Sequence, residues 1–212
     1  MKKETETHDP ENMLIEVSEA VPKYDRHIRY TYADYITWGE DVKCELIDGI
    51  IYDMSPAPGS MHQDISGNIF GQLFIFLEGK PCKVYHAPFD VRLDPNGADR
   101  TVVQPDILVI CDRSIITKAG CSGAPDMVIE ILSPSNAMKD MMLKSAKYQL
   151  AGVREIWMID PVDKVVMTFY SENGEYKSIH YINKDKIPVK ILEGCSIDMA
   201  RVFAETDIFG VI

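Results

Sequence analysis

Residues 104–157 read QPDILVICDRSIITKAGCSGAPDMVIEILSPSNAMKDMMLKSAKYQLAGVREIW, and the fold is organised around them. Two short apolar runs in this stretch, PDILVI and DMVIEIL, carry acidic residues: Asp106 in the first, and Glu130 in the second, which opens with Asp126. The segment that follows contains Lys144. An ionised carboxylate inside an apolar strand is costly unless it is paired with a cation or binds a metal. The pattern therefore predicts a metal-dependent hydrolytic site.

The segments around Glu130 predict a strand, a helix and a second strand. Residues 126–132 are apolar on both faces, as is typical of a central strand, so Glu130 is expected to be largely buried. Ser135 is expected to cap a helix over 136–151, and 154–160 to form another buried strand. This order predicts a right-handed crossover between two parallel strands, while the remaining strands are expected to be antiparallel. The core stripe of the helix is expected at three apolar positions: Leu143, Ala146 and Leu150.

Turn residues and apolar periodicity divide the rest of the chain into further elements. They are a short helix over 31–38 capped by Thr31, a hairpin over 44–54 around Asp48-Gly49, a helix capped by Ser60 that ends near Leu77, a strand over 83–93 interrupted near Pro88, a strand over 102–111, and a hairpin over 164–182. Together these elements predict a mixed α/β (α+β) fold.

The composition suits one domain of ordinary size. The chain has 212 residues, of which 46% are hydrophobic and 26% charged, enough apolar material for a sizeable core. Residues 1–25 are polar and acidic and are interpreted as an N-terminal arm, followed by a single domain over 26–212. The net charge of -11 argues against broad non-specific binding to nucleic acid, which needs surplus Lys and Arg. A local basic cleft, or a metal that neutralises the site, remains compatible with this charge.

The five cysteines, at positions 44, 82, 111, 121 and 195, are an odd number without a CxxC pair. This spacing favours free thiols in a reducing cytoplasm, and disulfides are not expected. The N-terminal segment lacks the apolar region of a signal peptide, and no run of about 18 apolar residues is present that could span a membrane. We therefore expect a cytoplasmic protein with no membrane partner.

Asp106 and Glu130 are the best candidates for metal ligands. Mg²⁺ prefers oxygen ligands and commonly binds one or two carboxylates together with water and substrate phosphates. A metal held there would polarise a phosphoryl oxygen and lower the pKa of a bound water. Lys144 could orient that water or neutralise the charge that develops at phosphorus. The alternative for each carboxylate alone is a salt bridge or a turn cap, since ion-pair networks also bury acids.

Further polar side chains have both a functional and a structural interpretation. Glu45 is either an additional acidic contact in the same cleft or a carboxylate at a hairpin edge. His62, in the first turn of a helix, could touch a phosphate or shuttle a proton. Its structural interpretation is a capping or a solvent histidine. Tyr148 either hydrogen-bonds the lysine or a phosphate, or lies at the edge of the core. Asp140 lies four residues before the candidate lysine and could hold it in place, and Lys147 is the alternative if that lysine points away.

A series of short motifs lies in order over about residues 30–205. They are Glu45-Leu-Ile-Asp-Gly49, the Ser-Pro loop before His62, Pro105-Asp106, Gly123-Ala-Pro-Asp126, Glu130-Ile-Leu-Ser-Pro134, Asp140 with Lys144 and Tyr148, Gly152-Val153, and Trp157-Met-Ile-Asp-Pro161. In combination they resemble the Uma2 family of restriction endonucleases, which belongs to the PD-(D/E)XK nuclease superfamily. The resemblance implies a restriction-endonuclease-like core in which a mixed central β-sheet is flanked by helices.

The resemblance also implies roles for individual residues. Asp106 matches the aspartate of the PD motif, and Glu130 matches the acidic residue of the (D/E)XK motif. Leu132 stands where the general motif has its lysine, and Uma2-like sequences are thought to supply that lysine from the following helix, here Lys144. The main-chain carbonyl of Ile131 is then expected to be a further metal ligand.

The leading hypothesis is a Mg²⁺- or Mn²⁺-dependent endonuclease that hydrolyses DNA phosphodiester bonds. One alternative is a catalytically inactive member of the same fold that binds nucleic acid or a protein, and another is a phosphohydrolase acting on a small substrate. Nucleases of this fold often dimerise to cut two strands, so the resemblance also implies a homodimer. The hairpin over 164–182 is its candidate interface, and a satellite core under the hairpin is the other interpretation.

Overall fold

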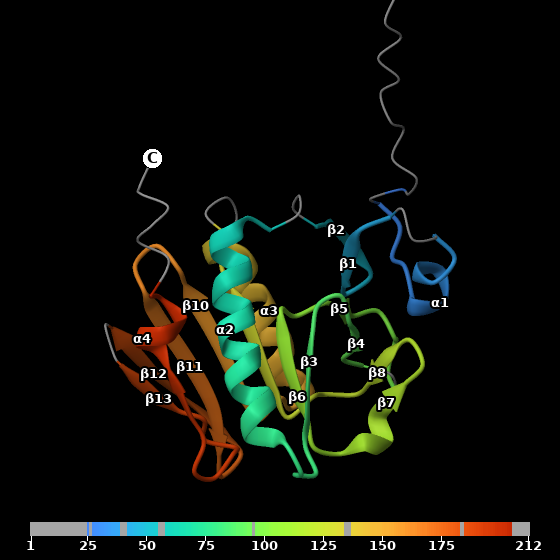
Figure 1. Ribbon diagram of the computed structural model, residues 1–212. Helices are drawn as coiled ribbons and strands as arrows, with labels where there is room; N and C mark the ends of the chain where they lie inside the picture. The colour runs from blue at the N-terminus through green and yellow to red at the C-terminus, as the bar shows by residue number, and fades with distance from the viewer. Residues whose placement is uncertain are drawn as a thin grey trace, which may run out of the picture.

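The computed structural model describes residues 25, 27–38, 42–54, 58–94, 96–133, 137–182 and 185–204, and for residues 137–141 the backbone alone (Figure 1). The arm predicted over 1–25 lies outside the described residues except for Asp25, and so does the cap predicted at Ser135. No helix in the described part of the chain is long and apolar enough to cross a membrane.

A six-stranded mixed sheet forms the centre of the molecule (Figure 1). In spatial order its strands are β12 (Glu175–Ile182), β11 (Val165–Glu172), β10 (Glu155–Asp160), β9 (Met127–Ile131), β6 (Ile107–Ile110) and β3 (Lys83–His86). β9 and β10 are parallel and helix α3 (Ala137–Ala151) connects them, which confirms the predicted strand–helix–strand unit. Each of the other neighbouring pairs in this sheet is antiparallel.

Helix α2 (Ser60–Leu77) lies over one face of this sheet (Figure 1). Its N-cap residue is Gly59 rather than the predicted Ser60, because the backbone is still extended at Gly59 and is helical from the next residue. The helix buries an apolar stripe at helical spacing with these members: Ile65, Ile69, Leu73 and Leu77.

Helix α3 lies on the opposite face, but its buried side differs from the predicted one. Ala146 is exposed and Leu150 is 80% exposed, whereas Tyr148 is fully buried. The helix turns the side that carries Lys144 and Tyr148 toward the sheet, because both side chains reach the buried carboxylate of Glu130. The polar contacts of this helix therefore set its rotation, and apolar spacing alone does not predict it.

A second six-stranded sheet carries the N-terminal elements (Figure 1). Its spatial order is β2 (Ile50–Asp53), β1 (Cys44–Ile47), β5 (Val102–Val103), β4 (Asp90–Arg92), β8 (Gly120–Ser122) and β7 (Ile116–Thr117). β4 and β8 are parallel, so the expectation that all strands outside the crossover are antiparallel is wrong. The pairing needs Gly120, because a Cβ there would lie 2.1 Å from the carbonyl oxygen of Asp90.

Two local predictions in the N-terminal half are confirmed. Helix α1 (Tyr32–Tyr35) begins after Thr31, whose N–H donates to the carboxylate of Asp34 at 2.8 Å, as in a capping box. The β1–β2 hairpin turns at Asp48 and Gly49, whose φ angles are 52° and 78°. Positive φ at both central residues is the reason that Asp-Gly is a strong hairpin signal.

The strand predicted over 102–111 is two strands in different sheets. β5 pairs with β1 and β4, whereas β6 pairs with β3 and β9. The chain crosses between the sheets at Gln104, Pro105 and Asp106, where the proline has no N–H for a ladder and restricts the residue before it. The crossing places Asp106 at the start of a central strand, close to the second sheet.

Cys82 and Cys111 form a disulfide, which corrects the expectation of five free thiols. In the antiparallel β3–β6 pair Lys83 is opposite Ile110, so the residues just outside this pair face each other. The two cysteines are 29 residues apart in the sequence, and the strand register brings them together. The remaining three cysteines are free and buried: Cys44, Cys121 and Cys195.

The C-terminal elements complete the α2 side of the core. They are β13 (Lys186–Pro188), β14 (Ser196–Asp198) and helix α4 (Met199–Val202). The hairpin of β11 and β12 forms as predicted, with a turn at Asn173 and Gly174. Three of its apolar side chains pack against the α3 side of the core, which favours the satellite-core interpretation: Met167, Phe169 and Tyr176.

Candidate active site

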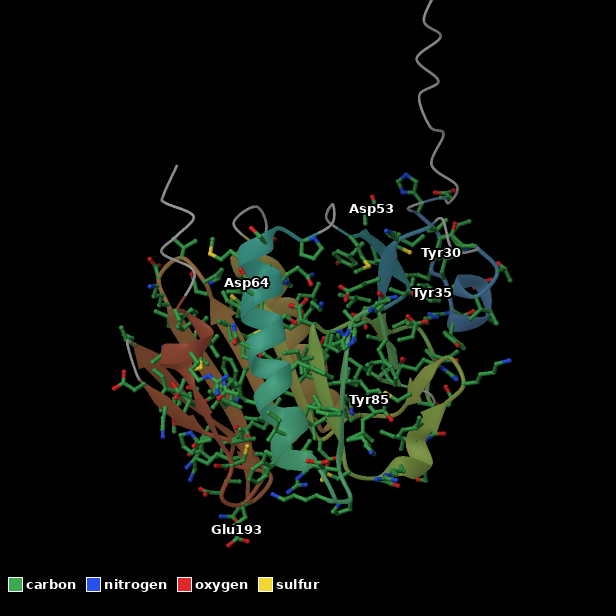
Figure 2. The ribbon with its side chains drawn as sticks, in the orientation of Figure 1. Tyr30, Tyr35, Asp53, Asp64, Tyr85 and Glu193 are labelled. Carbon is green, nitrogen blue, oxygen red and sulfur yellow. A yellow bond between two sulfur atoms is a disulfide. The ribbon has the colours of Figure 1, made fainter. Side chains whose placement is uncertain are left out.

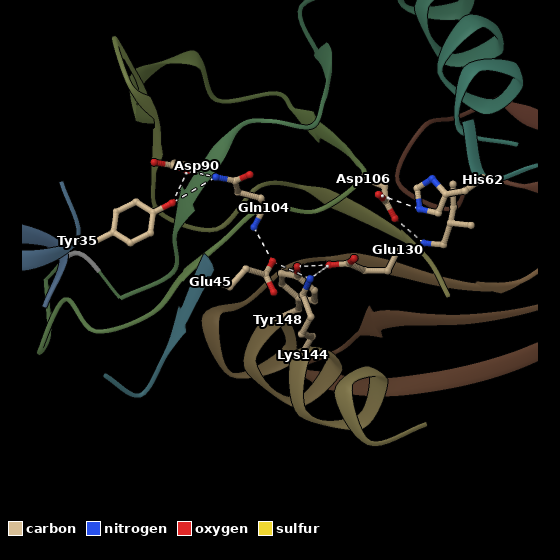
Figure 3. Close-up of polar contacts among 10 residues, drawn as sticks. Tyr35, Glu45, His62, Asp90, Gln104, Asp106, Glu130, Lys144 and Tyr148 are labelled. Carbon is tan, nitrogen blue, oxygen red and sulfur yellow. Dashed lines mark hydrogen bonds and ion pairs between the residues drawn. The ribbon is translucent and has the colours of Figure 1, made fainter. Parts of the chain in front are cut away.

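The predicted site residues meet where the two sheets and two helices approach one another (Figure 3). They come from strand β1, the first turn of α2, the crossing between β5 and β6, strand β9 and the middle of α3: Glu45, His62, Asp106, Glu130 and Lys144. The fold thus gathers side chains that span a hundred positions of the sequence into one polar cluster.

Asp106 is held by a neighbouring strand and a helix. Its Oδ2 accepts a hydrogen bond from the backbone N–H of Ile131 at 2.7 Å, and its Oδ1 lies 3.2 Å from Nε2 of His62. Its main-chain carbonyl accepts a hydrogen bond from the N–H of Ala87 at 3.0 Å. Because Ile131 follows Glu130 directly, the first of these bonds ties the two candidate acids together across adjacent strands.

Lys144 lies between two carboxylates. Its Nζ is 2.8 Å from Oε1 of Glu130 and 2.8 Å from Oε1 of Glu45. Tyr148, one turn further along α3, donates its hydroxyl to the same Oε1 of Glu130 at 2.5 Å. Glu130 is only 9% exposed, so these contacts replace most of its hydration. The strand carboxylate and the helix lysine therefore form one buried polar unit.

The electrostatics of this unit are unbalanced toward negative charge. Burial raises the pKa of Glu130 to about 7; Lys144 opposes this shift, and the carboxylates of Asp106 and Glu45 add to it. Burial alone would lower the pKa of Lys144, but the two carboxylates beside it outweigh burial and raise it, so the lysine is charged near neutral pH. Glu45 and Glu130 share the ammonium group of Lys144, while Asp106 pairs with His62. A further cation would relieve the repulsion among the three carboxylates.

His62 is the other basic group in the cluster. Burial lowers its pKa, but the hydrogen bond and the charge of Asp106 outweigh burial, so that the pKa is raised. Its Nε2 faces Asp106, while its Nδ1 is buried and has no hydrogen-bond partner within the described residues. The imidazole is therefore placed to hold a proton at Nε2 beside the acid.

The donor set fits a hard divalent cation. Asp106 and Glu130 offer carboxylate oxygens from neighbouring strands, and the surplus negative charge favours a cation. Among the described residues no group of three or more His, Cys, Asp or Glu side chains is arranged to hold a metal ion. Further ligands would have to be main-chain oxygen and water, which are common around Mg²⁺. The carbonyl of Ile131 is the predicted main-chain ligand.

The structure also separates the weaker candidates. Lys147 turns away from the cluster and pairs with a carboxylate of the β1–β2 turn, and the side chain of Asp140 lies outside the described residues. Tyr148 is more than a residue at the core edge, because its hydroxyl contacts the site. Gln104 was missed: its backbone N–H donates to Glu45 Oε1 at 2.8 Å. The sequence signal for this residue is its position directly before Pro105 and Asp106, which places it next to a candidate metal ligand.

A mixed central sheet with a helix on each face defines an α/β protein. The crystal structure of a "putative nuclease belonging to DUF820" from Anabaena variabilis matches with a TM-score of 0.68 at 19% identity, covering 82% of this chain and 98% of that one. This likeness confirms the predicted fold class.

Sequence comparison identifies the family. An uncharacterized protein of Synechocystis sp., slr1290, is 25% identical over 162 residues, which are 74% of this chain and 83% of the relative. A sequence model of the Uma2 family, described as "Putative restriction endonuclease", matches residues 31–200. The chain therefore belongs to the Uma2 family.

Proposed function

We propose that this chain is a Mg²⁺- or Mn²⁺-dependent endonuclease that hydrolyses phosphodiester bonds in DNA. The observation that carries the proposal is the contact of Lys144 with Glu130 at 2.8 Å, on the strand next to Asp106, in a member of the family described as "Putative restriction endonuclease". Asp106, Glu130 and the carbonyl of Ile131 would hold the metal. When bound, such an ion supplies a polarised phosphoryl oxygen and a water of lowered pKa.

The remaining residues of the cluster have complementary roles in this proposal. Lys144 orients the attacking water and neutralises the charge that develops on the scissile phosphate. Glu45 holds the lysine ammonium in place from the side opposite Glu130. His62 holds a proton at Nε2 next to Asp106 and can deliver it to a phosphate oxygen.

The test is nicking of supercoiled plasmid in a series of metals with an EDTA arm. We expect cleavage with Mg²⁺ or Mn²⁺, none with EDTA, and losses on the order of 100-fold or more in Asp106→Ala and Glu130→Ala. Asp112→Asn is the matched control, because this exposed carboxylate caps a short helix elsewhere and should leave cleavage unchanged. Cleavage that persists in Asp106→Ala and Glu130→Ala would contradict the proposed site.

Two other outcomes would favour the other candidate functions. Metal binding without cleavage of supercoiled, linear or single-stranded DNA would indicate an inactive member of the fold that binds nucleic acid or a protein. Hydrolysis of p-nitrophenyl phosphate without DNA cleavage would indicate a phosphohydrolase for small substrates. The net charge of -11 makes DNA affinity depend on local contacts and metal rather than on overall attraction.

The proposal includes a cytoplasmic location, a single domain over 26–212 and a homodimer that cuts both strands. The hairpin of β11 and β12 stays the candidate dimer interface, although the side chains of Met167, Phe169 and Tyr176 pack against the core of their own chain. The interface would therefore use the opposite face or the free edge of β12, which is the terminal strand of its sheet. Light scattering on the purified chain measures the oligomeric state directly.

A further inference from the structure

A second polar cluster lies beside the candidate active site and is built from Tyr35, Asp90 and Gln104 (Figure 3). The side-chain amide of Gln104 donates from Nε2 to Asp90 Oδ1 at 2.7 Å and to the hydroxyl oxygen of Tyr35 at 3.2 Å. The hydroxyl of Tyr35 donates to the same Oδ1 of Asp90 at 3.2 Å. Tyr35 belongs to the α1 side of the molecule, together with Tyr30 (Figure 2). The amide is thus fixed by two partners of the N-terminal sheet region.

The main chain of Gln104 connects this cluster to the site. Its backbone N–H donates to Oε1 of Glu45 at 2.8 Å, and that oxygen is the one that also lies 2.8 Å from Nζ of Lys144. Gln104 is also two residues before Asp106, at the point where the chain passes from one sheet to the other. Gln104 therefore contacts Glu45, the carboxylate that pairs with Lys144, and lies two residues before the candidate metal ligand Asp106.

The crossing segment has little regular structure to hold it. Gln104 lies between β5 and β6, and the following residue, Pro105, has no N–H to offer to either sheet. On its N-terminal side this segment is held by the side-chain amide of Gln104, which hydrogen-bonds Asp90 and Tyr35. An amide suits this position, because a carboxylate at 104 would place a second negative charge against Asp90.

We propose that Gln104, anchored by Asp90 and Tyr35, is a positioning residue that sets Glu45 and, through it, the ammonium of Lys144. This inference rests on the proposed nuclease function. Gln104 does not touch the reacting atoms. Its role is to keep the lysine between two carboxylates that belong to different sheets, Glu45 in one and Glu130 in the other.

The kinetic test uses Gln104→Ala, the exchanged pair Gln104→Glu/Asp90→Asn, and a control. In the exchanged pair donor and acceptor swap places, so the hydrogen bond between the two positions is restored. Asp99→Asn is the control, since Asp99 pairs with Arg92 in the same sheet region but makes no contact with Glu45. The variants are compared in kcat and KM for metal-dependent plasmid nicking, and in urea unfolding midpoint.

We expect Gln104→Ala to lower kcat about tenfold or more with KM within about twofold, because the lysine is misplaced while the DNA contacts remain. The exchanged pair should recover most of this loss, and the control should stay within about twofold of the wild type in kcat even if its midpoint falls. A kcat for Gln104→Ala within about twofold of wild type, or no recovery in the exchanged pair, would overturn the inference.

A second readout does not depend on catalysis and separates this inference from the proposed function. If the wild type cleaves no DNA, the proposed function fails. The coupling between Gln104 and Lys144 can still be measured by comparing the urea unfolding midpoints of Gln104→Ala, Lys144→Met and the double variant with that of the wild type. Shifts that are clearly smaller in the double variant than the sum of the two single shifts support positional coupling. Additive shifts overturn it.

Discussion

Replacing Lys144 by methionine tests the central unit of the site most directly. The side chain is 14% exposed and its Nζ lies 2.8 Å from one oxygen each of Glu45 and Glu130, both of whose side chains are 12% exposed. Methionine fills similar space without the charge. Lys144→Met therefore leaves two poorly hydrated carboxylates without their shared cation, and no new cavity of consequence.

The structure allows the magnitude to be worked out. Removing one partner of a buried ion pair typically costs about 3–5 kcal/mol, because the other charge stays buried and unpaired. The pKa of Glu130 is already raised to about 7 by burial, so this carboxyl can take up a proton and relieve part of the cost. We expect Lys144→Met to lower the free energy of unfolding by about 3 kcal/mol at pH 8. The loss should be smaller at pH 6, where Glu130 is largely neutral in the folded wild type and ionised in the unfolded chain.

Lys147→Met is the matched control, because Lys147 lies on the same helix and its Nζ is 2.6 Å from Oδ2 of Asp48. The side chain of Asp48 is 59% exposed, so this pair should contribute only about 0–1 kcal/mol. Urea unfolding at pH 8 and pH 6 gives the free energy of unfolding of each variant, and plasmid nicking gives its cleavage activity. We expect Lys144→Met to abolish nicking and Lys147→Met to retain it. Equal losses of stability in the two variants, or nicking retained in Lys144→Met, would refute the reasoning.

Three further predictions follow from individual contacts. Because a metal needs ionised Glu130, whose pKa is about 7, calorimetric affinity for Mn²⁺ should rise up to about tenfold per pH unit below pH 7 and level off above it, and Glu130→Gln should bind Mn²⁺ more weakly throughout this range. Thiol titration of the denatured, unreduced chain should give three thiols rather than five, and reducing the Cys82–Cys111 bond, which closes a separation of 29 residues, should cost about 3–4 kcal/mol of unfolding free energy. Gly120→Ala should cost at least about 2 kcal/mol in urea unfolding because its Cβ would meet β4 backbone, whereas Gly97→Ala, with ordinary contacts, should change little.

The sequence was sufficient for the parts of the fold that local patterns control. A strand apolar on both faces, a helix-length segment and a second apolar run leave only a parallel pair with a crossover, and β9, α3 and β10 have that arrangement. The acids Asp106 and Glu130 could be expected near each other because their runs are both central. The structure places Asp106 directly before β6 and Glu130 on the adjacent strand β9, linked through the N–H of Ile131.

Features that depend on register or rotation could not be read from the sequence. The Cys82–Cys111 bond forms because the register of β3 against β6 places the two cysteines opposite each other. The spacing of the cysteines in the sequence does not predict this register. The rotation of α3 follows from polar contacts of Lys144 and Tyr148 with a buried acid, against the apolar stripe that periodicity favours. The break of the 102–111 segment into two sheets follows from Pro105, a signal that was present but was outweighed by the apolar residues around it.

The position of the lysine on a helix has a structural consequence for the site. Leu132 directly follows β9 and lies two residues after Glu130, so in extended backbone a lysine at position 132 would point to the same face as Glu130. Here the ammonium arrives from α3, which packs over that face, so its placement depends on how helix and sheet dock. A second carboxylate, that of Glu45 on the other sheet, also contacts this ammonium and adds to its placement. Because the ammonium of Lys144 comes from a helix and contacts Glu45, the N-terminal sheet borders the candidate active site through Glu45 and Gln104.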